Sequence, residues 1–245
     1  MDDDRLAAEQ RFFDEQYRKD SGSLNGFYEV SGARREYAKR ILRDCAGKRV
    51  LEYECGTGSY AFALADRGAA VTGIDISSTA IELARARGYP PENPEFRLGN
   101  AEALEFADGS FDVVCGTSIL HHLDIERALR ELRRVLRPGG RAVFYEPVAY
   151  NPVVNLYRLL TPHLHTLDEH PLTRADLQAM TENFGRLDAR FADFFALAAI
   201  PALRLPGGTA LLRVLEAADR IAMRVPGLRW WGAVVVIELH APSAS

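Results

Sequence analysis

The stretch Arg49-Val-Leu-Glu-Tyr-Glu-Cys-Gly-Thr-Gly58, with Ala70-Val-Thr-Gly-Ile-Asp75 after it, decides the fold of this chain. Its apolar start predicts a buried strand, its two glycines predict a tight turn, and residues 60–67 have the apolar spacing of a helix. Glycines in such a turn let the main chain approach a ligand closely, and N–H groups at the helix start are free to meet negative charge. Asp75 ends the next strand, where a carboxylate can accept both hydroxyls of a ribose. The stretch therefore indicates a nucleoside-containing cofactor, although any doubly wound α/β domain can carry such a turn.

The residues after this stretch repeat the alternation of strand and helix. Three further apolar runs predict buried strands, at residues 96–98, 111–115 and 141–146. Ser77 is expected to cap one helix, and residues 124–137 carry a regular apolar stripe that predicts another. This alternation predicts a doubly wound α/β sheet with five parallel strands.

The last third of the chain is predicted to complete this sheet. Thr173 is expected to cap a helix that ends at Phe184, with Asp176 in the capping-box position. Residues 187–194 and 233–239 alternate like strands, and the two would form an antiparallel edge. We therefore expect a Rossmann-like sheet of seven strands in a single domain, residues 1–245.

Three segments are expected to form a helical cap on the sheet: residues 1–45, 147–172 and 195–231. The first has the pattern of two amphipathic helices, and the second is expected to be irregular because prolines punctuate it. The third has apolar residues at helical spacing, and the opposite face carries Arg213, Glu216, Asp219, Arg220 and Arg224. This pattern fits a lid over an apolar substrate, an interface in a homodimer or with a partner subunit, a membrane-surface helix, or packing within the molecule.

Composition excludes several classes of protein. The chain of 245 residues has 47% hydrophobic residues, enough for a core, and its net charge of −4 argues against a nucleic-acid binder. Cys45, Cys55 and Cys115 show no metal-ligand spacing and suit the reducing cytoplasm. The acidic N-terminus is not a secretory signal, and no apolar run approaches the roughly 20 residues of a membrane span. We therefore expect a cytoplasmic protein.

The motifs within residues 49–146 resemble, in content and order, those of class I S-adenosylmethionine-dependent methyltransferases. These motifs are Val50-Leu-Glu-x-x-Cys-Gly-Thr-Gly58, Gly73-Ile-Asp-Ile-Ser77, Ala101-Glu-x-Leu-x-Phe106, Phe111-Asp-Val-Val114, Leu120-His-His-Leu123 and Leu136-Arg-Pro-Gly-Gly140. The resemblance implies S-adenosylmethionine as cofactor and a small-molecule substrate. Because the sulfonium already makes the methyl group electrophilic, such an enzyme mainly aligns the acceptor and, where needed, removes its proton.

The resemblance also implies roles for single residues around the first two strands. Glu52 and the backbone from Gly56 to Gly58 would hold the methionine part of the cofactor. Asp75 would bind the ribose hydroxyls, and Ile76 would flank the adenine.

Residues at the ends of the next two strands would complete the site. By the same resemblance, Asn100 and Ala101 would meet the amino edge of the adenine. Ser118 and the histidines after it would lie where the methyl group faces the acceptor. Among the aromatic residues near the N-terminus, most are expected to pack a helix onto the domain, and Tyr28 is expected to cover a ligand.

Two positions depart from the family pattern. Asn100 stands where aspartate is usual, a mild change because an amide oxygen can still accept a hydrogen bond from adenine. Glu54 stands where glycine is usual, and it adds volume and negative charge near the expected carboxylate of the cofactor. Glu54 could turn away or pair with Arg34 or Arg35, or it could attract the positive groups of the cofactor. In a third interpretation the pocket serves another reaction, with Glu54 as a catalytic acid, base or substrate anchor.

Histidines near the predicted site are candidates for a general base, because imidazole titrates near neutrality. His170 is our first choice and His121 its competitor, with structural hydrogen bonding as the alternative for each. His163, His165, Glu169 and His170 lie close together in the sequence, but their spacing matches no metal motif. We therefore predict no metal.

The sequence thus favours methyl transfer from S-adenosylmethionine to a small, fairly apolar acceptor in secondary metabolism. One alternative is an enzyme of the same fold that no longer uses this cofactor and catalyses elimination or cyclisation of a natural-product intermediate, for example a sulfated amine. Another is a non-catalytic subunit that binds a related chain through residues 195–231.

Overall fold

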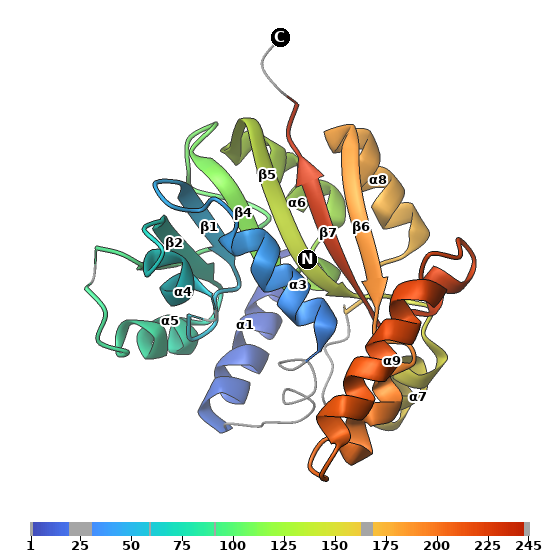
Figure 1. The fold of residues 1–245 in the computed structure, drawn as a ribbon. Coiled ribbons are helices and arrows are strands. Elements are labelled where there is room, and N and C mark those ends of the chain that lie inside the picture. The colour runs from blue at the N-terminus through green and yellow to red at the C-terminus, as the bar shows by residue number, and fades with distance from the viewer. Residues whose placement is uncertain (1, 20–30, 59, 91, 163–168, 243–245) are drawn as a thin grey trace.

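The strands of the computed structural model, which describes residues 2–19, 31–58, 60–90, 92–162 and 169–242, form one sheet in the order β3-β2-β1-β4-β5-β7-β6 (Figure 1). They are β1 (Arg49–Tyr53), β2 (Ala70–Asp75), β3 (Glu95–Leu98), β4 (Phe111–Thr117), β5 (Leu136–Pro147), β6 (Arg186–Ala192) and β7 (Val234–His240). Strands β1 to β5 are parallel, and β7 runs antiparallel to both of its neighbours, β5 and β6. The predicted seven-stranded, doubly wound sheet with an antiparallel edge is confirmed.

Helices cover both faces of this sheet. The helices of the chain are α1 (Asp2–Lys19), α3 (Gly32–Leu42), α4 (Ala61–Ala65), α5 (Ser78–Arg85), α6 (Ile125–Val135), α7 (Pro152–Leu160), α8 (Arg174–Phe184) and α9 (Gly208–Ala222). Shorter 3-10 helices are η1 (Leu120–His122), η3 (Ala196–Ala202) and η4 (Leu228–Trp231). Helices α3, α4 and α5 pack on one face, and α6 and α8 pack on the other. None of the helices in the described ranges is long and apolar enough to cross a membrane.

Strand β1 shows why two helical layers form. Leu51 and Tyr53 point into the core beneath α6 and α8, whereas Val50 points into the core beneath α3. Successive side chains of a strand alternate between the faces of a sheet, so a strand that is buried at four successive positions, as β1 is from Val50 to Tyr53, needs cover on both sides.

The capping residues predicted from the sequence largely match the structure. Ser77 caps α5, and Thr173 and Asp176 form the predicted capping box of α8. Asp124, for which no cap was predicted, caps α6. Strand β5 differs, since it begins at Leu136 instead of Arg141. A break in register where β4 meets β5 lets Leu136 pair with Phe111, so the strand starts before the proline and glycines.

The prediction of an irregular segment at residues 147–172 is wrong for α7. Asn151 caps this helix by accepting hydrogen bonds from the N–H groups of Val153 and Val154, at 2.9 Å each, and Pro152 occupies the first turn. The Asn151-Pro152 step therefore starts a helix. Proline is tolerated there because the N–H groups of the first turn have no partner within the helix, so the missing N–H of proline costs no hydrogen bond.

The other two cap segments also take up definite positions. Helix α1 lies against α5 and the loops at the carboxyl ends of the strands, whereas α3 packs on the sheet against β5 and β7. The segment 195–231 connects β6 to β7 in the sequence, and within it η3 packs against α9. On α9, Leu212 of the predicted apolar stripe is buried, whereas Leu211, Val214 and Ile221 are exposed, so packing within the molecule accounts for only part of this stripe. Glu216 and Asp219, predicted on the opposite face, are buried.

Candidate functional site

The turn between β1 and α4 has a conformation that glycine adopts without strain. Gly56 and Gly58 have φ angles of 52° and 88°, and a Cβ atom at Gly58 would lie 2.2 Å from the ring of Phe62. The N–H of Gly56 donates to Asp75 Oδ2 at 2.9 Å, and the N–H of Ser77 donates to Oδ1 at 2.8 Å. The glycine turn and the acidic end of β2 therefore form one unit at the carboxyl edge of the sheet.

Four predicted cofactor-binding residues line one cavity at this edge: Asp75, Ile76, Asn100 and Ala101. Glu54 also lines it, and Leu6 and Glu9 of α1 contribute further walls. About 10 Å³ is left free, room for about one water molecule, whereas small-molecule sites occupy roughly 300 Å³ or more. With α1 in this position, the enclosed part of the site is too small for a nucleoside, and an open cavity of about 380 Å³ that shares Leu6, Ile76 and Asn100 adjoins it.

Polar contacts at two points hold α1 in this position. Near its start, Arg5 forms an ion pair with Glu102, which follows β3. Further along, Asp14 accepts hydrogen bonds from Ser77 Oγ and, at 3.1 Å, from the N–H of Thr79 at the start of α5. These contacts join α1 to the loops that follow β2 and β3.

Tyr17 of α1 is a site residue that the sequence analysis missed, because Tyr28 was preferred among the aromatic residues. Its hydroxyl oxygen lies 2.6 Å from the position that a Cβ atom on Gly56 would take, so a side chain there would collide with it. Burial and the carboxylates of Asp75 and Glu54 raise the pKa of Tyr17. Tyr28 lies outside the described residues.

The carboxylates near the glycine turn make this edge of the sheet acidic. Glu52 Oε1 accepts a hydrogen bond from the N–H of Tyr60 at 3.0 Å, whereas its buried Oε2 has no hydrogen-bond partner among the described residues. Burial raises the pKa of Glu52 to about 8 and that of Asp75 to about 6, against the effect of backbone N–H groups. The site is therefore suited to a ligand with a positive group.

Glu54 has a left-handed backbone, with φ at 43°. This conformation costs a residue with a Cβ atom about 1 kcal/mol or more, which explains why glycine suits the position. Burial raises the pKa of Glu54 well above its ordinary value, and the carboxylates of Asp75, Glu146 and Glu9 raise it further. The raised pKa favours the neutral carboxyl group, and a positive ligand group beside Glu54 would favour its ionised form.

One alternative for Glu54, an ion pair with Arg34 or Arg35, does not match the positions of these arginines. The Arg34 guanidinium lies over the ring of Tyr60, 5.1 Å from its centroid, and Arg35 pairs with Glu216 at 2.6 Å. Both arginines project from α3 on the sheet face, so neither neutralises Glu54.

His121, in the loop after β4, is buried between two carboxylates. Its Nδ1 lies 2.9 Å from Glu146 Oε2, and its Nε2 lies 3.5 Å from Glu169 Oε1. Glu146 Oε1 also accepts the N–H groups of Ile119 and Leu120, at 3.0 Å each, which fixes the carboxylate at the end of β5. Burial lowers the pKa of His121, but the hydrogen bonds to the two carboxylates outweigh it, so the pKa is raised.

The other predicted residues near His121 differ in their surroundings. Burial and the neighbouring charge of His121 lower the pKa of His122 to about 3, so His122 is neutral. His170 is exposed, and its N–H donates to the His121 carbonyl at 2.9 Å. Ser118 has a φ of 57°, and its N–H donates to the Tyr145 carbonyl at 2.8 Å. Of the two histidines predicted as bases, His121 is thus the one in a buried hydrogen-bond network.

Glu169 connects this network to α7. It forms an ion pair with Arg158 of that helix. Burial favours the protonated carboxyl, but the hydrogen bonds from His121 and Arg158 outweigh it and lower the pKa of Glu169. The potential ligand atoms of His121, His122 and Glu169 lie within 4.8 Å of one another, a spacing that a metal ion could use. His163 and His165, the other histidines of the predicted cluster, lie outside the described residues.

A parallel doubly wound sheet, a glycine turn after β1 and a carboxylate at the end of β2 define a Rossmann-like protein with a nucleoside site. Residues 51–144 match the family model described as "Methyltransferase domain". Demethylmenaquinone methyltransferase of Staphylococcus aureus is 30% identical over 196 residues, which cover 77% of this chain and 76% of that protein. The chain belongs to the class I S-adenosylmethionine-dependent methyltransferase family.

Two further comparisons show how far the similarity extends. Demethylmenaquinone methyltransferase of Chlorobaculum parvum is 39% identical over 129 residues, 50% of this chain and 52% of that protein. In matches at this level of identity, the chain spans about half the length of the curated relatives. An N-methyltransferase of Haemonchus contortus, solved with phosphomonomethylethanolamine and S-adenosylhomocysteine, has a TM-score of 0.66 at 16% identity, covering 96% of this chain and 60% of that one. The last similarity shows the shared fold.

The residues of the cavity fit the cofactor of this family. Asp75, which lines the cavity, offers a carboxylate for the ribose. Glu52 is not part of the cavity lining, but its unpaired, buried Oε2 offers an acceptor for the ammonium group of S-adenosylmethionine. The surrounding negative charge suits the sulfonium. Because α1 fills the volume, this helix has to move before the cofactor can enter.

Proposed function

We propose that the protein transfers a methyl group from S-adenosylmethionine to a hydroxyl oxygen or an acidic carbon of a small, fairly apolar acceptor. Bound S-adenosylmethionine supplies an electrophilic methyl group. The observation that carries the proposal is the buried pair of His121 and Glu146. His121 lies in the same loop as Ile119 and Leu123, which line the cofactor cavity.

His121 is the general base in this proposal. Its Nδ1–H donates to Glu146, and its Nε2 would take the proton once the acceptor's hydroxyl replaces Glu169 as the partner of this nitrogen. The Glu146 carboxylate stabilises the imidazolium that forms, while its bonds to two backbone N–H groups keep it in place. Glu169, near Nε2 and neutralised by Arg158, lies where it can orient the acceptor's hydroxyl.

The cofactor residues keep the roles that the family resemblance implies. Glu52 and the turn from Gly56 to Gly58 would hold the methionine part, and Asp75 the ribose. The adenine part would lie between Ile76 and the pair Asn100 and Ala101. Ser118 would border the acceptor.

The acceptor in this proposal is a hydroxylated ring carried on an apolar body. The names of two relatives, demethylmenaquinone methyltransferases, support such an acceptor. We place the reaction in a biosynthetic pathway in the cytoplasm, and the expected role in secondary metabolism remains part of the proposal.

Titration calorimetry and a methyl-transfer assay with hydroxylated quinols test the proposal. We expect binding of S-adenosylmethionine and of S-adenosylhomocysteine, and methylated product whose formation falls by about 100-fold or more in His121→Ala, the range attributed to a general base. Cofactor binding with unchanged turnover in His121→Ala would refute the role of this histidine. Absence of cofactor binding would refute methyl transfer itself.

A cofactor-independent enzyme is the second candidate, and Glu54 favours it. A carboxyl group with a raised pKa in a closed cavity can donate or accept a proton in elimination or cyclisation. This candidate predicts that Glu54→Gly abolishes turnover and that neither cofactor form binds. The first candidate predicts that both bind and that Glu54→Gly keeps its activity.

A further inference from the structure

Helix α9 exposes an apolar stripe on the side away from the protein core. Its stripe, at alternating intervals of three and four residues, consists of Leu211, Val214, Ala218, Ile221 and Val225, the last just beyond the helix end. The exposed fractions of Val214 and Ile221 are 66% and 71%. The same helix buries a different stripe that includes Leu212, Glu216 and Asp219. An apolar stripe on the solvent side has no role in folding and marks an interaction surface.

Helix α7 presents a second exposed apolar stripe. None of its nine residues is buried, although its sequence is the apolar run Pro-Val-Val-Asn-Leu-Tyr-Arg-Leu-Leu. Val153, Leu156 and Leu160 follow the helical spacing, and the exposed fractions of Leu159 and Leu160 are 75% and 70%. Apolar side chains this exposed on one helix are expected to contact something outside the molecule.

A hydrogen bond and aromatic contacts connect α7 to the segment that contains α9. The side-chain amide of Asn151, which caps α7, donates to the carbonyl of Trp231 at 2.6 Å. The exposed ring of Trp231 lies 5.7 Å from that of Phe194, which in turn contacts Phe195 before η3 and α9. Both helices lie at the same corner of the molecule (Figure 1). We call α7 together with residues 195–231 the α7–α9 surface.

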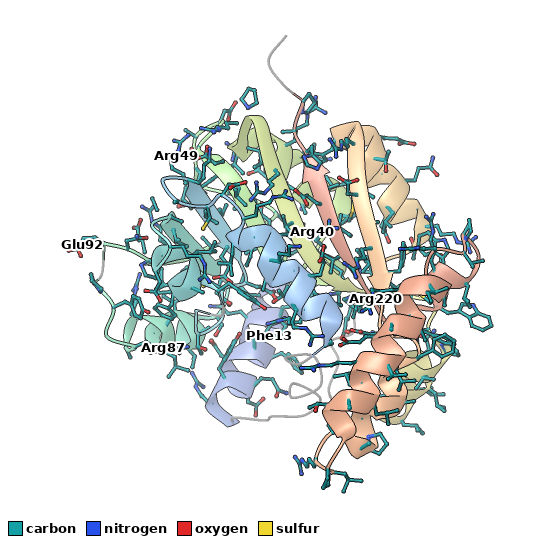
Figure 2. All side chains as sticks on the ribbon, in the orientation of Figure 1. Phe13, Arg40, Arg49, Arg87, Glu92 and Arg220 are labelled. Atoms are coloured by element: carbon teal, nitrogen blue, oxygen red, sulfur yellow. The ribbon has the colours of Figure 1, made fainter. Side chains whose placement is uncertain are left out.

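The exposed charge of this surface is entirely basic. Residues 195–231 contain five arginines, all exposed, and two acidic residues, both buried. Glu216 pairs with Arg35, and Asp219 accepts the N–H groups of Phe195 and Ala196 at the start of η3. The exposed arginines are Arg204, Arg213, Arg220, Arg224 and Arg229, and Figure 2 marks Arg220 on α9.

Most of this positive charge is not neutralised by the protein itself. Arg204, Arg213, Arg220 and Arg224 form no ion pair with any residue that the structure describes, and Arg229 stacks on the ring of Trp230 at 5.6 Å. The whole chain has a net charge of −4, so the basic surface runs against the average. The partner is therefore apolar and negatively charged.

We propose that the α7–α9 surface binds the surface of a bilayer that contains anionic phospholipids. Apolar stripes enter the boundary between headgroups and acyl chains, and flanking arginines pair with phosphates. A second copy of this chain fits less well, because a two-fold interface would bring the same unpaired arginines together. The inference is independent of the proposed methyl transfer, since it concerns a surface outside the cofactor cavity.

Helix α7 connects the proposed membrane-binding surface to the acceptor side of the site. Arg158 projects from α7 to Glu169, and Glu169 contacts His121. The α7–α9 surface thus adjoins the acceptor side of the site, and an acceptor dissolved in the bilayer would have a short path to it.

Co-sedimentation with vesicles tests the proposal in the full-length protein without cofactor or acceptor. We expect binding to vesicles of phosphatidylcholine mixed with phosphatidylglycerol, weak binding to phosphatidylcholine alone, and loss of binding at high salt. Leu156→Asp with Ile221→Asp should lower the partition coefficient by about tenfold or more, as should Arg213→Glu with Arg220→Glu. All four residues are exposed or unpaired, so these changes leave the core intact, which a thermal melt verifies.

Matched controls decide between the occupants. Leu83→Asp and Leu98→Asp alter exposed leucines on α5 and β3 and should leave vesicle binding unchanged. Absence of binding to the anionic vesicles, or binding equal in wild type and both double variants, would overturn the proposal. So would light scattering that shows a dimer which Ile221→Asp dissociates, because the surface would then belong to a second copy.

Discussion

Nδ1 of His121 lies 2.9 Å from Oε2 of Glu146, and both side chains are buried at the carboxyl edge of the sheet. Glu146 ends β5, and His121 follows the neighbouring strand β4, so parallel pairing of these strands brings them together. The carboxylate fixes the tautomer and orientation of the imidazole and favours its protonated form. This pair sets the pH dependence expected of the reaction.

Glu146→Gln is expected to shift the pH profile. The proposed base has to be neutral, so kcat/KM should rise with pH through the raised pKa of His121, above the ordinary value of about 6.5. An amide keeps an acceptor for the two backbone N–H groups but removes the charge. The pKa of His121 should fall, moving the acid limb to lower pH, and the plateau should drop by about tenfold or more. Glu169, His122 and Arg158 also surround the imidazole and remain unchanged in this variant.

The pH profile of kcat/KM in both proteins measures this shift, with Glu182→Gln on the exposed side of α8 as the matched control. An acid limb that stays in place in Glu146→Gln would show that His121 does not set it. A lower plateau with an unmoved limb would assign Glu146 a structural role only.

Gly58→Ala should destabilise the protein and remove cofactor binding. Its Cβ atom would lie 2.2 Å from Phe62 at a φ of 88°, so a collision adds to the cost of a left-handed backbone. We expect a loss of about 3 kcal/mol in the free energy of unfolding. Gly47→Ala is the control, because Gly47 has a φ of 69° and no atom near its missing side chain, and it should cost only about 1 kcal/mol. Urea denaturation compares them, and equal losses would show that the contact with Phe62 yields at no cost.

Much of the sheet was predictable because its signals are local. The apolar runs, the glycine turn and the caps at Ser77 and Thr173 each lie within a few residues of the element they define. The same holds for the cofactor edge, since the ends of parallel strands meet at one edge whatever the rest of the chain does.

The unpredicted features depend on contacts between distant segments. The position of α1 in the cofactor cavity, with Tyr17 over Gly56, rests on contacts with loops far along the chain. The sequence predicts Glu216 and Asp219 on the solvent side of α9, yet both are buried. Glu216 pairs with Arg35, and Asp219 accepts hydrogen bonds from the N–H groups at the start of η3. The sequence of a helix shows two faces that could be buried. Contacts with residues far along the chain decide which of them packs against the core.

Glu54→Gly is expected to stabilise the protein. Glycine relieves the left-handed backbone at a φ of 43°, and part of that gain is lost to the greater entropy of the unfolded chain, which leaves about 1 kcal/mol. The pKa of Glu54 is raised in the folded state, so the wild type loses stability as pH rises above the ordinary carboxyl value of about 4.3. The advantage of the variant should therefore grow with pH.

Thermal melts from mildly acidic to neutral pH check this prediction. Glu54→Asn is the control, because asparagine tolerates a left-handed backbone and carries no charge, so it separates strain from electrostatics. A Glu54→Gly variant less stable than wild type at every pH would mean that the glutamate makes a stabilising contact that outweighs its strain.

Asp14→Ala should open the cofactor cavity faster. Helix α1 fills the space that a nucleoside needs, and Asp14 fastens it to Ser77 and to the N–H of Thr79. Losing two hydrogen bonds to a charged group weakens this attachment by about 1.5 kcal/mol or more, so the association rate of S-adenosylhomocysteine should rise by about tenfold. Stopped-flow measurement of cofactor association tests this, with Arg11→Ala on the exposed side of α1 as the control. If helix movement limits entry, Asp14→Ala is faster and Arg11→Ala is not. Equal association rates in all three proteins would mean that the cofactor reaches its site by a route that α1 does not close.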